Sequence, residues 1–269
     1  MHSRFYSTVR PVAGQLKDAI KYTVPNPLLI RTLPRATRWY AEIMTWYTCG
    51  RHYSAPIVPT EIIKINPDTV TSRMTSKTKS VASHSDMICE VIEGDWDKHA
   101  RALSEYDLYN GFVDRFENGV AWESTEFYQS RVESIRSGKT KWGCSNADEL
   151  KTRLSKLDDL YQNIRNNGYA TQSEIRQKKL NKPAHYRSNE YLYPEFHEVI
   201  VNVGRDGEFI LHDGRHRLVI AQILGLQELP VRIKLRHKQW QLVRDKVFSS
   251  SSTFSDEYIQ HPDITLREH

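Results

Sequence analysis

The sequence has few cysteines and no long apolar run. Cys49, Cys89 and Cys144 lie far apart without C-x-x-C spacing, so the sequence signals neither a zinc site nor a disulfide framework. No apolar stretch approaches the roughly 18 residues of a transmembrane helix. The short segment "PLLIRTLP" is interrupted by Arg31 and lacks the continuous apolar region of a signal peptide. We therefore expect a cytoplasmic protein.

Acidic residues are nearly missing from the first 40 positions, where Asp18 is the only one. The same stretch contains the basic residues Arg4, Arg10, Lys17, Lys21, Arg31, Arg35 and Arg38. This excess predicts a solvated basic face or an arm, residues 1–51, that contacts nucleic acid. Aromatic residues at the end of this stretch allow a further alternative, association with a membrane surface. They are Trp39, Tyr40, Trp46 and Tyr47.

The chain has 269 residues, enough for one large domain or two modest ones. Shifts in composition divide it into five segments. They are a basic aromatic segment (1–55), an opening part with strand patterns (56–97), a helical block (98–180), a hairpin–helix–strand core (181–248) and a flexible tail (249–269). The Ser-rich residues 72–86 predict a mobile loop. We expect an α+β protein, with a small mixed sheet and an inserted or appended helical block.

The clearest helical pattern of the block lies in residues 145–168. Ser145 or Asn146 can cap its start, and acidic residues occupy its first turn. Apolar residues recur on one face, namely Leu150, Leu154, Leu157, Leu160, Tyr161 and Ile164. Gly168 ends the pattern. The spacing predicts a long amphipathic helix that buries this face.

The main candidate site is the turn "DGRHR", residues 213–217, between an apolar strand and an apolar helix. Such a turn exposes the free N–H groups of the first helical turn, which favour an anion. Gly214 lets a ligand approach the backbone, and Arg215 and Arg217 can grip phosphate. His216 can donate or move a proton. Asp213 can hold a metal ion or accept a hydroxyl proton. The alternative is a capped turn with its arginines in solvent.

Two further stretches supply candidate residues. In "EGDWD", Asp95 and Asp97 suit Mg²⁺, which prefers one or two carboxylates together with water and phosphate oxygens. The alternative is a solvated Asx turn. Arg236 and His237 follow the closing strand pattern, and ligands gather at the ends of strands in open sheets. We therefore expect both residues to contact phosphate.

The stretch "DGRHRLVIAQILGLQELPVRI" resembles the nucleotide-binding core of the ParB/sulfiredoxin superfamily. The helix pattern from Arg217 to Gly225 and the strand pattern from Leu229 to Ile233 carry the resemblance. With the preceding hairpin "EVIVNVGRDGEFILHDG", it covers about residues 196–237. Residues 58–70, "VPTEIIKINPDTV", resemble the opening strand and turn of such domains. That second resemblance implies that the helical block is an insertion within the fold.

Members of this superfamily have different activities, and the turn separates them. Arg215 stands where sulfiredoxins carry a cysteine, which argues against their chemistry. Too few residues follow Ile233 for the helix-turn-helix domain of a chromosome-partition factor. The turn is most similar to the Asp-Gly-x-x-Arg form of the small-molecule kinase branch. That resemblance implies that Glu61, in the opening strand, is an acidic base.

The resemblance implies a nucleotide-binding protein, a Mg²⁺-dependent phosphotransferase or nucleotidase that uses ATP, ADP or CTP and acts on a small hydroxyl compound. Phosphoryl transfer depends mostly on positioning and charge neutralisation. The expected residues are Asp213, His216 and Glu61 for catalysis, Gly214, Arg215, His216, Arg217, Arg236 and His237 for phosphate, and Asp95, Asp97 and Asp213 for the metal. The alternatives are a nucleotide-gated DNA-binding protein or nuclease with a basic N-terminal arm, and a catalytically inactive scaffold.

Overall fold

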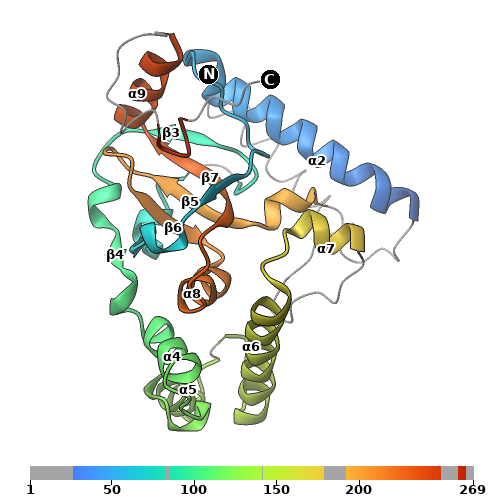
Figure 1. Cartoon of the computed structure of the whole chain (residues 1–269), viewed down its shortest axis with the longest axis vertical. Helices are drawn as coiled ribbons and strands as arrows, with labels where there is room; N and C mark the ends of the chain where they lie inside the picture. The colour runs from blue at the N-terminus through green and yellow to red at the C-terminus, as the bar shows by residue number, and fades with distance from the viewer. Residues whose placement is uncertain (1–26, 83–84, 141, 179–191, 250–259, 265–269) are drawn as a thin grey trace.

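The protein combines a mixed β-sheet with a helical block that extends away from it (Figure 1). The structure is a computed structural model that describes residues 27–82, 85–140, 142–178, 192–249 and 260–264. It has the α+β architecture that the sequence predicts, a small mixed sheet joined to helices. None of the described helices is both long and apolar enough to cross a membrane.

The described strands form one seven-stranded sheet in the order β1-β7-β5-β6-β2-β4, with β3 paired to β7. The strands are β1 (Ile63–Ile65), β2 (Ser72–Arg73), β3 (Glu90–Ile92), β4 (Arg101–Ala102), β5 (Val199–Val203), β6 (Phe209–Asp213) and β7 (Leu229–His237). β5 and β6 form the predicted antiparallel hairpin, and β7 runs parallel to β5. Every residue of β7 is buried, because the strand has neighbours on both edges and is covered on both faces.

The helices are α2 (Pro27–Thr48), α3 (Ser76–Lys79), α4 (Asp107–Phe116), α5 (Glu126–Arg136), α6 (Ala147–Asn167), α7 (Gln172–Lys178), α8 (Arg215–Ile223) and α9 (Lys238–Ser249). Helices α4 to α7 lie between β4 and β5 in the chain, and both strands belong to the same sheet. The helical block is therefore an insertion within the fold rather than an appended domain. Figure 1 shows α4, α5 and α6 below the sheet, with α8 between.

Helix α6 has the boundaries that the sequence predicts. The side chain of Asn146 accepts a hydrogen bond from the backbone N–H of Glu149 (2.9 Å), which satisfies one free donor of the first turn. Gly168 ends the helix with a φ of 75°, a conformation that glycine adopts without strain. The predicted apolar face is buried along its whole length. Burial of this face holds α6 against α4, α5 and α8.

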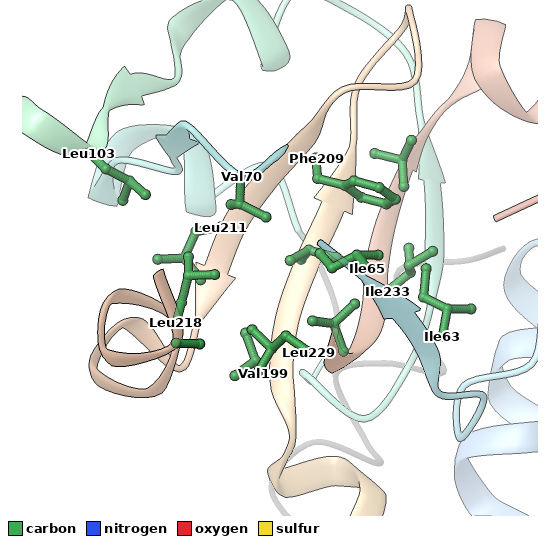
Figure 2. Close-up of a cluster of buried hydrophobic side chains, with 14 of the residues drawn as sticks. Ile63, Ile65, Val70, Leu103, Val199, Phe209, Leu211, Leu218, Leu229 and Ile233 are labelled. Atoms are coloured by element: carbon green, nitrogen blue, oxygen red, sulfur yellow. The ribbon is translucent and has the colours of Figure 1, made fainter. Parts of the chain in front are cut away.

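Helix α8 lies between two hydrophobic clusters. Its Leu218 and Ala221 join the cluster on the sheet, most of whose other members come from β1, β5, β6 and β7 (Figure 2). Its Val219 and Ile220 join the cluster of the helical block. A helix that is apolar all round is buried all round. α8 therefore connects the insertion rigidly to the sheet and fixes the position of its own N-terminus.

Two predictions about irregular segments were wrong for the residues that the structure describes. Residues 72–86 are not a mobile loop throughout, because they contain β2 and α3, and Thr75 and Thr78 form a capping box at the start of α3. The tail is also ordered at residues 260–264. Asp263 is buried there and binds Arg236 (2.7 Å) and the indole N–H of Trp240 (2.8 Å). Two buried arginines, Arg236 and Arg244, bind this carboxylate, and their ion pairs hold this part of the tail in place despite its polar composition.

Candidate functional site

The turn between β6 and α8 has a conformation that requires glycine. Gly214 has a φ of 88°, and a Cβ at this position would lie 2.9 Å from the Cα of Val199 on β5. The turn therefore brings the N-terminus of α8 directly against the start of β5. Free N–H groups and the positive end of the helix dipole face outward from this point. The tight turn at Gly214 is the one that the sequence predicts, and anion binding at it stays a prediction.

A pocket of about 410 Å³ opens at this turn. Its walls are residues 213–217, the segment containing Phe196, His197, Glu198 and Ile200 at the start of β5, and Arg153 from α6. The volume lies within the range of pockets that hold small molecules. The inserted helical block therefore contributes one wall and the sheet the others.

Arg215 is a pocket-lining cation that is partly removed from water. It is half-buried, and its guanidinium lies 5.7 Å from the ring centroid of Trp142. Burial lowers the pKa of Arg215, and the positive charges of Arg73, Arg131 and Arg153 add to that effect. Among the described residues, the Arg215 guanidinium has no hydrogen-bond acceptor. Several arginines thus lie near Arg215, and no carboxylate of a described residue binds its guanidinium.

The indole of Trp142 organises these cations. Arg131 and Arg153 also lie over its ring, at 5.1 Å and 5.5 Å from the centroid. Trp142 has a φ of 55°, which for a bulky residue is strained. Backbone strain of this kind concentrates at functional sites. Trp142 does not line the pocket, but its ring contacts two arginines that do, and the sequence analysis did not identify it.

Lys79, at the end of α3, brings a further cation to Asp213. Burial lowers the pKa of Lys79, and the charges of Asp213 and Asp86 act against that shift. The ammonium group donates no hydrogen bond to any described residue. The carboxylate of Asp213 is exposed at the pocket. Asp213 is thus accessible to a ligand while a lysine and an arginine stand nearby.

Arg217 has a structural role within the pocket wall. Its guanidinium donates to the carbonyl of His197 (2.6 Å) and to the hydroxyl of Tyr169 (3.2 Å), and it lies 3.5 Å from the carboxylate of Glu198. Glu198 also accepts hydrogen bonds from Tyr169 and from the backbone N–H of Gln172. Burial raises the pKa of Glu198 to about 6, although Arg217 lowers it. These bonds tie α8 to α7 and to the start of β5.

His216 lines the pocket, and its ring contacts two aromatic side chains. Its ring stacks on Phe112, with centroids 5.7 Å apart, and meets the ring of Trp142 edge-on at 5.5 Å. Phe112 is fully buried in the core of the helical block. The imidazole is therefore packed between aromatic rings, a position that limits the rotation a proton shuttle needs.

Arg236 and His237 lie at the opposite end of the sheet from Asp213. Asp213 is level with Ile200 at the start of β5, whereas Arg236 pairs with Val203 at its end. Arg236 is buried in a bidentate ion pair with Asp263, and His237 bonds to the carbonyl of Gly94 (2.8 Å). The two predicted phosphate contacts are therefore not part of this pocket. β7 continues beyond its sequence pattern, through Arg236 and His237, and takes both side chains into the interior.

The predicted metal ligands do not come together. Asp95 and Asp97 bind the guanidinium of Arg205, at 2.7 Å and 2.8 Å, at the hairpin turn that precedes β6. Asp213 lies at the other end of β6, about 13 Å away at the rise of a β-strand. No group of three or more His, Cys, Asp or Glu side chains that could hold a metal occurs within the described residues. Arg205, whose position the sequence did not suggest, neutralises the acidic turn.

Glu61 lies across the sheet from Asp213. It precedes β1, and the order β1-β7-β5-β6 separates the two positions by three strand spacings, about 14 Å. Its negative charge acts on Arg236 and Arg244 instead. The predicted acidic base is therefore not brought into the pocket in this conformation.

The predicted nucleic-acid arm is described only from residue 27 onward, and residues 1–26 lie outside the described part. Within it, α2 begins at Pro27, earlier than the sequence pattern indicated, and continues to Thr48. Its solvent-facing side carries large apolar side chains together with Arg35 and Arg38.

No protein-family model matches the sequence, and no curated protein and no solved structure is significantly similar to it. The function of the pocket must therefore be argued from its own residues.

Proposed function

We propose that the protein binds a nucleotide in the pocket at the N-terminus of α8 and acts as a phosphotransferase or nucleotidase on a small hydroxyl compound. The observation that carries this proposal is the environment of Arg215. A guanidinium that is half-buried among three other arginines, with no acceptor among the described residues, costs free energy unless an anion joins it. A phosphate group supplies the missing negative charge and two oxygens that the planar guanidinium can bind together.

The remaining pocket residues suit the parts of such a ligand. Arg215 and Arg153 line the pocket next to the first turn of α8, where phosphates would lie, and Lys79 adds its positive charge near Asp213. Phe196 and Ile200 give the pocket an apolar wall against which a base or sugar can pack. The similarity of residues 196–237 to the ParB/sulfiredoxin nucleotide-binding core supports the same ligand class.

Asp213 is the residue we assign to the chemistry. Its exposed carboxylate can accept a hydrogen bond from an acceptor hydroxyl and orient the hydroxyl oxygen towards the phosphoryl group. It also fits as the single protein ligand of Mg²⁺, since this ion usually keeps several waters and binds phosphate oxygens. When bound, Mg²⁺ would neutralise charge on the phosphates. Lys79 and Arg215 would stabilise the negative charge that remains.

The binding part of the proposal is tested by thermal unfolding with ATP, ADP, CTP and GTP, each with and without Mg²⁺. A ligand that binds only the folded state at 100 times its Kd adds about 2.7 kcal/mol to the free energy of unfolding. We expect such stabilisation by one of these nucleotides and its loss in Arg215→Ala. Arg165→Ala is the matched control, because it removes the same charge from an exposed position on α6. No stabilisation by any nucleotide would overturn the ligand class.

The catalytic part is tested separately with Asp213→Asn, which keeps the shape of the side chain and removes its charge. We expect nucleotide hydrolysis or transfer to fall at least about 100-fold, because a positioned acid–base group contributes on this order. The thermal midpoint should stay unchanged, since the side chain is exposed. Full activity in this variant would exclude the role of Asp213 and leave nucleotide binding intact.

A further inference from the structure

Helix α2 is turned so that its small residues face the protein. Ala41 and Thr45 are fully buried, and Cys49 beyond the helix end follows on the same side. The hydroxyl of Thr45 accepts a hydrogen bond from the backbone N–H of Cys89 (3.1 Å), and the hydroxyl of Thr37 accepts one from the backbone N–H of Tyr193 (3.2 Å). These contacts fix the rotation of α2 about its axis.

The opposite side of α2 carries its large apolar side chains. Trp39, Ile43 and Trp46 are 68%, 64% and 61% exposed, and their spacing of four and three residues puts them on one face of the helix. Tyr40 and Tyr47 flank them. We call these five residues the aromatic face. A helix on the surface of a globular protein normally turns its apolar side towards the core, so this orientation is reversed.

The charge around the aromatic face is positive. Arg35 is exposed, and the guanidinium of Arg51 lies 4.6 Å from the ring centroid of Tyr47. Glu42 is the acidic residue within α2, and it forms an ion pair with Arg38 (2.7 Å). The preceding 26 residues add further basic side chains in the sequence. An apolar centre is thus bordered by cations.

We infer that the aromatic face binds the surface of a membrane that contains anionic lipid. Tryptophan and tyrosine favour the boundary between lipid headgroups and acyl chains, and arginine can extend from there to anionic headgroups. A helix of 22 residues is about 33 Å long and would lie flat on the surface. A second copy of the chain fits less well, because it would bring two positive borders together. Nucleic acid fits less well because an isoleucine between two tryptophans offers it no polar contact.

The test uses the full chain and flotation with vesicles of phosphatidylcholine alone or mixed with phosphatidylserine. We expect the protein to float with phosphatidylserine vesicles, to bind less at high salt and to show a blue shift of tryptophan fluorescence. The variant Trp39→Ser/Ile43→Ser/Trp46→Ser should lose roughly tenfold or more in vesicle affinity. Ile43→Asp tests the same face with a single change and should lose affinity as well. Both variants should keep the wild-type thermal midpoint, because the residues are exposed.

The matched control is Leu242→Ser/Phe248→Ser on α9, where both side chains are 45% exposed. It should bind vesicles as the wild type does. Absence of binding to either vesicle, or an equal loss in the control, would overturn the inference. If the wild type does not bind vesicles but forms a dimer, and the triple variant is a monomer, the aromatic face would be assigned to contact with a second copy. Binding of RNA or DNA that the triple variant abolishes, again without vesicle binding, would assign it to nucleic acid.

Discussion

Arginines gather at both ends of β5, and the two groups differ in their acidic partners. At one end, Arg236 and Arg244 share the buried carboxylate of Asp263, at 2.7 Å and 3.3 Å. At the other end, Arg215 and Arg153 line the same pocket, and both lie over the ring of Trp142. Neither guanidinium binds a carboxylate of a described residue. The first group, which we call the complete group, binds a carboxylate of the protein, whereas the second, which we call the incomplete group, binds none among the described residues.

This difference separates a structural role from a binding role. Both groups contain cations taken out of water, which costs free energy. The carboxylate of Asp263 offsets that cost. Arg236 therefore keeps its positive charge, and its pKa is raised despite burial. Around Arg215 the charge of Asp213 offsets only part of the cost, and the pKa of Arg215 is lowered. The first and the last of the predictions below change one member of each group, and the second changes a buried carboxylate beside the pocket.

The largest expected effect is on the complete group. Asp263→Ala should lower the free energy of unfolding by about 3–5 kcal/mol, because it leaves two arginines buried without their carboxylate. Urea denaturation measures this loss. Glu228→Ala is the control, since its ion pair with Lys64 is exposed and should contribute only about 0–1 kcal/mol. Equal losses in both variants would contradict the distinction between buried and exposed pairs.

An intermediate effect is expected at Glu198, whose carboxylate is buried beside the pocket. Its pKa is raised from 4.5 to about 6, so the folded state binds the proton more tightly than the unfolded state. Its contribution to stability is therefore present below about pH 4.5 and is lost as the pH rises through 6. The shift corresponds to about 2 kcal/mol. Relative to the wild type, Glu198→Gln should gain this amount between pH 4 and pH 7 in urea denaturation. A difference that does not change with pH would contradict this prediction.

The smallest effect is expected at the incomplete group without ligand. Arg215→Met should change the free energy of unfolding by no more than about 0.5 kcal/mol, because lost contacts with Trp142 are balanced by relief of repulsion from neighbouring arginines. The same urea series measures it. A loss as large as that of Asp263→Ala would show that Arg215 supports the fold, and the contrast between the two groups would fail.

The sequence predicts the helices and strands of this protein better than it predicts which residues the charged side chains bind. The start and end of α6 follow from Asn146 and Gly168, because capping and positive φ are local properties. The left-handed conformation of Gly214 at the turn is local as well. Arg153 reaches the pocket from a distant segment, and the charge of Asp213 acts on Lys79 from another, but no spacing in the sequence relates either residue to Arg215.

The same limit explains the predictions that the structure does not support. Arginine is a residue type that binds phosphate, and aspartate is one that binds metal ions. In this protein, however, Arg236 and Asp95 each form an ion pair with another residue of the chain. Whether a charged side chain is satisfied depends on which remote segment packs against it. Asp263 follows a serine-rich stretch that indicates only a flexible tail, so nothing nearby in the sequence marked it as the partner of a buried arginine.

The central position of β7 has a consequence for how the protein is made. Ile63 of β1 pairs with Val231, and Glu90 of β3 pairs with Leu235, so both early strands depend on the last strand of the chain. At ribosomal speed, β7 emerges on the order of ten seconds after β1. The inserted helices have their own apolar cluster of local contacts and can assemble during that interval. The sheet can therefore close only after β7 has emerged, and until then β1 and β3 lack the strand with which they pair.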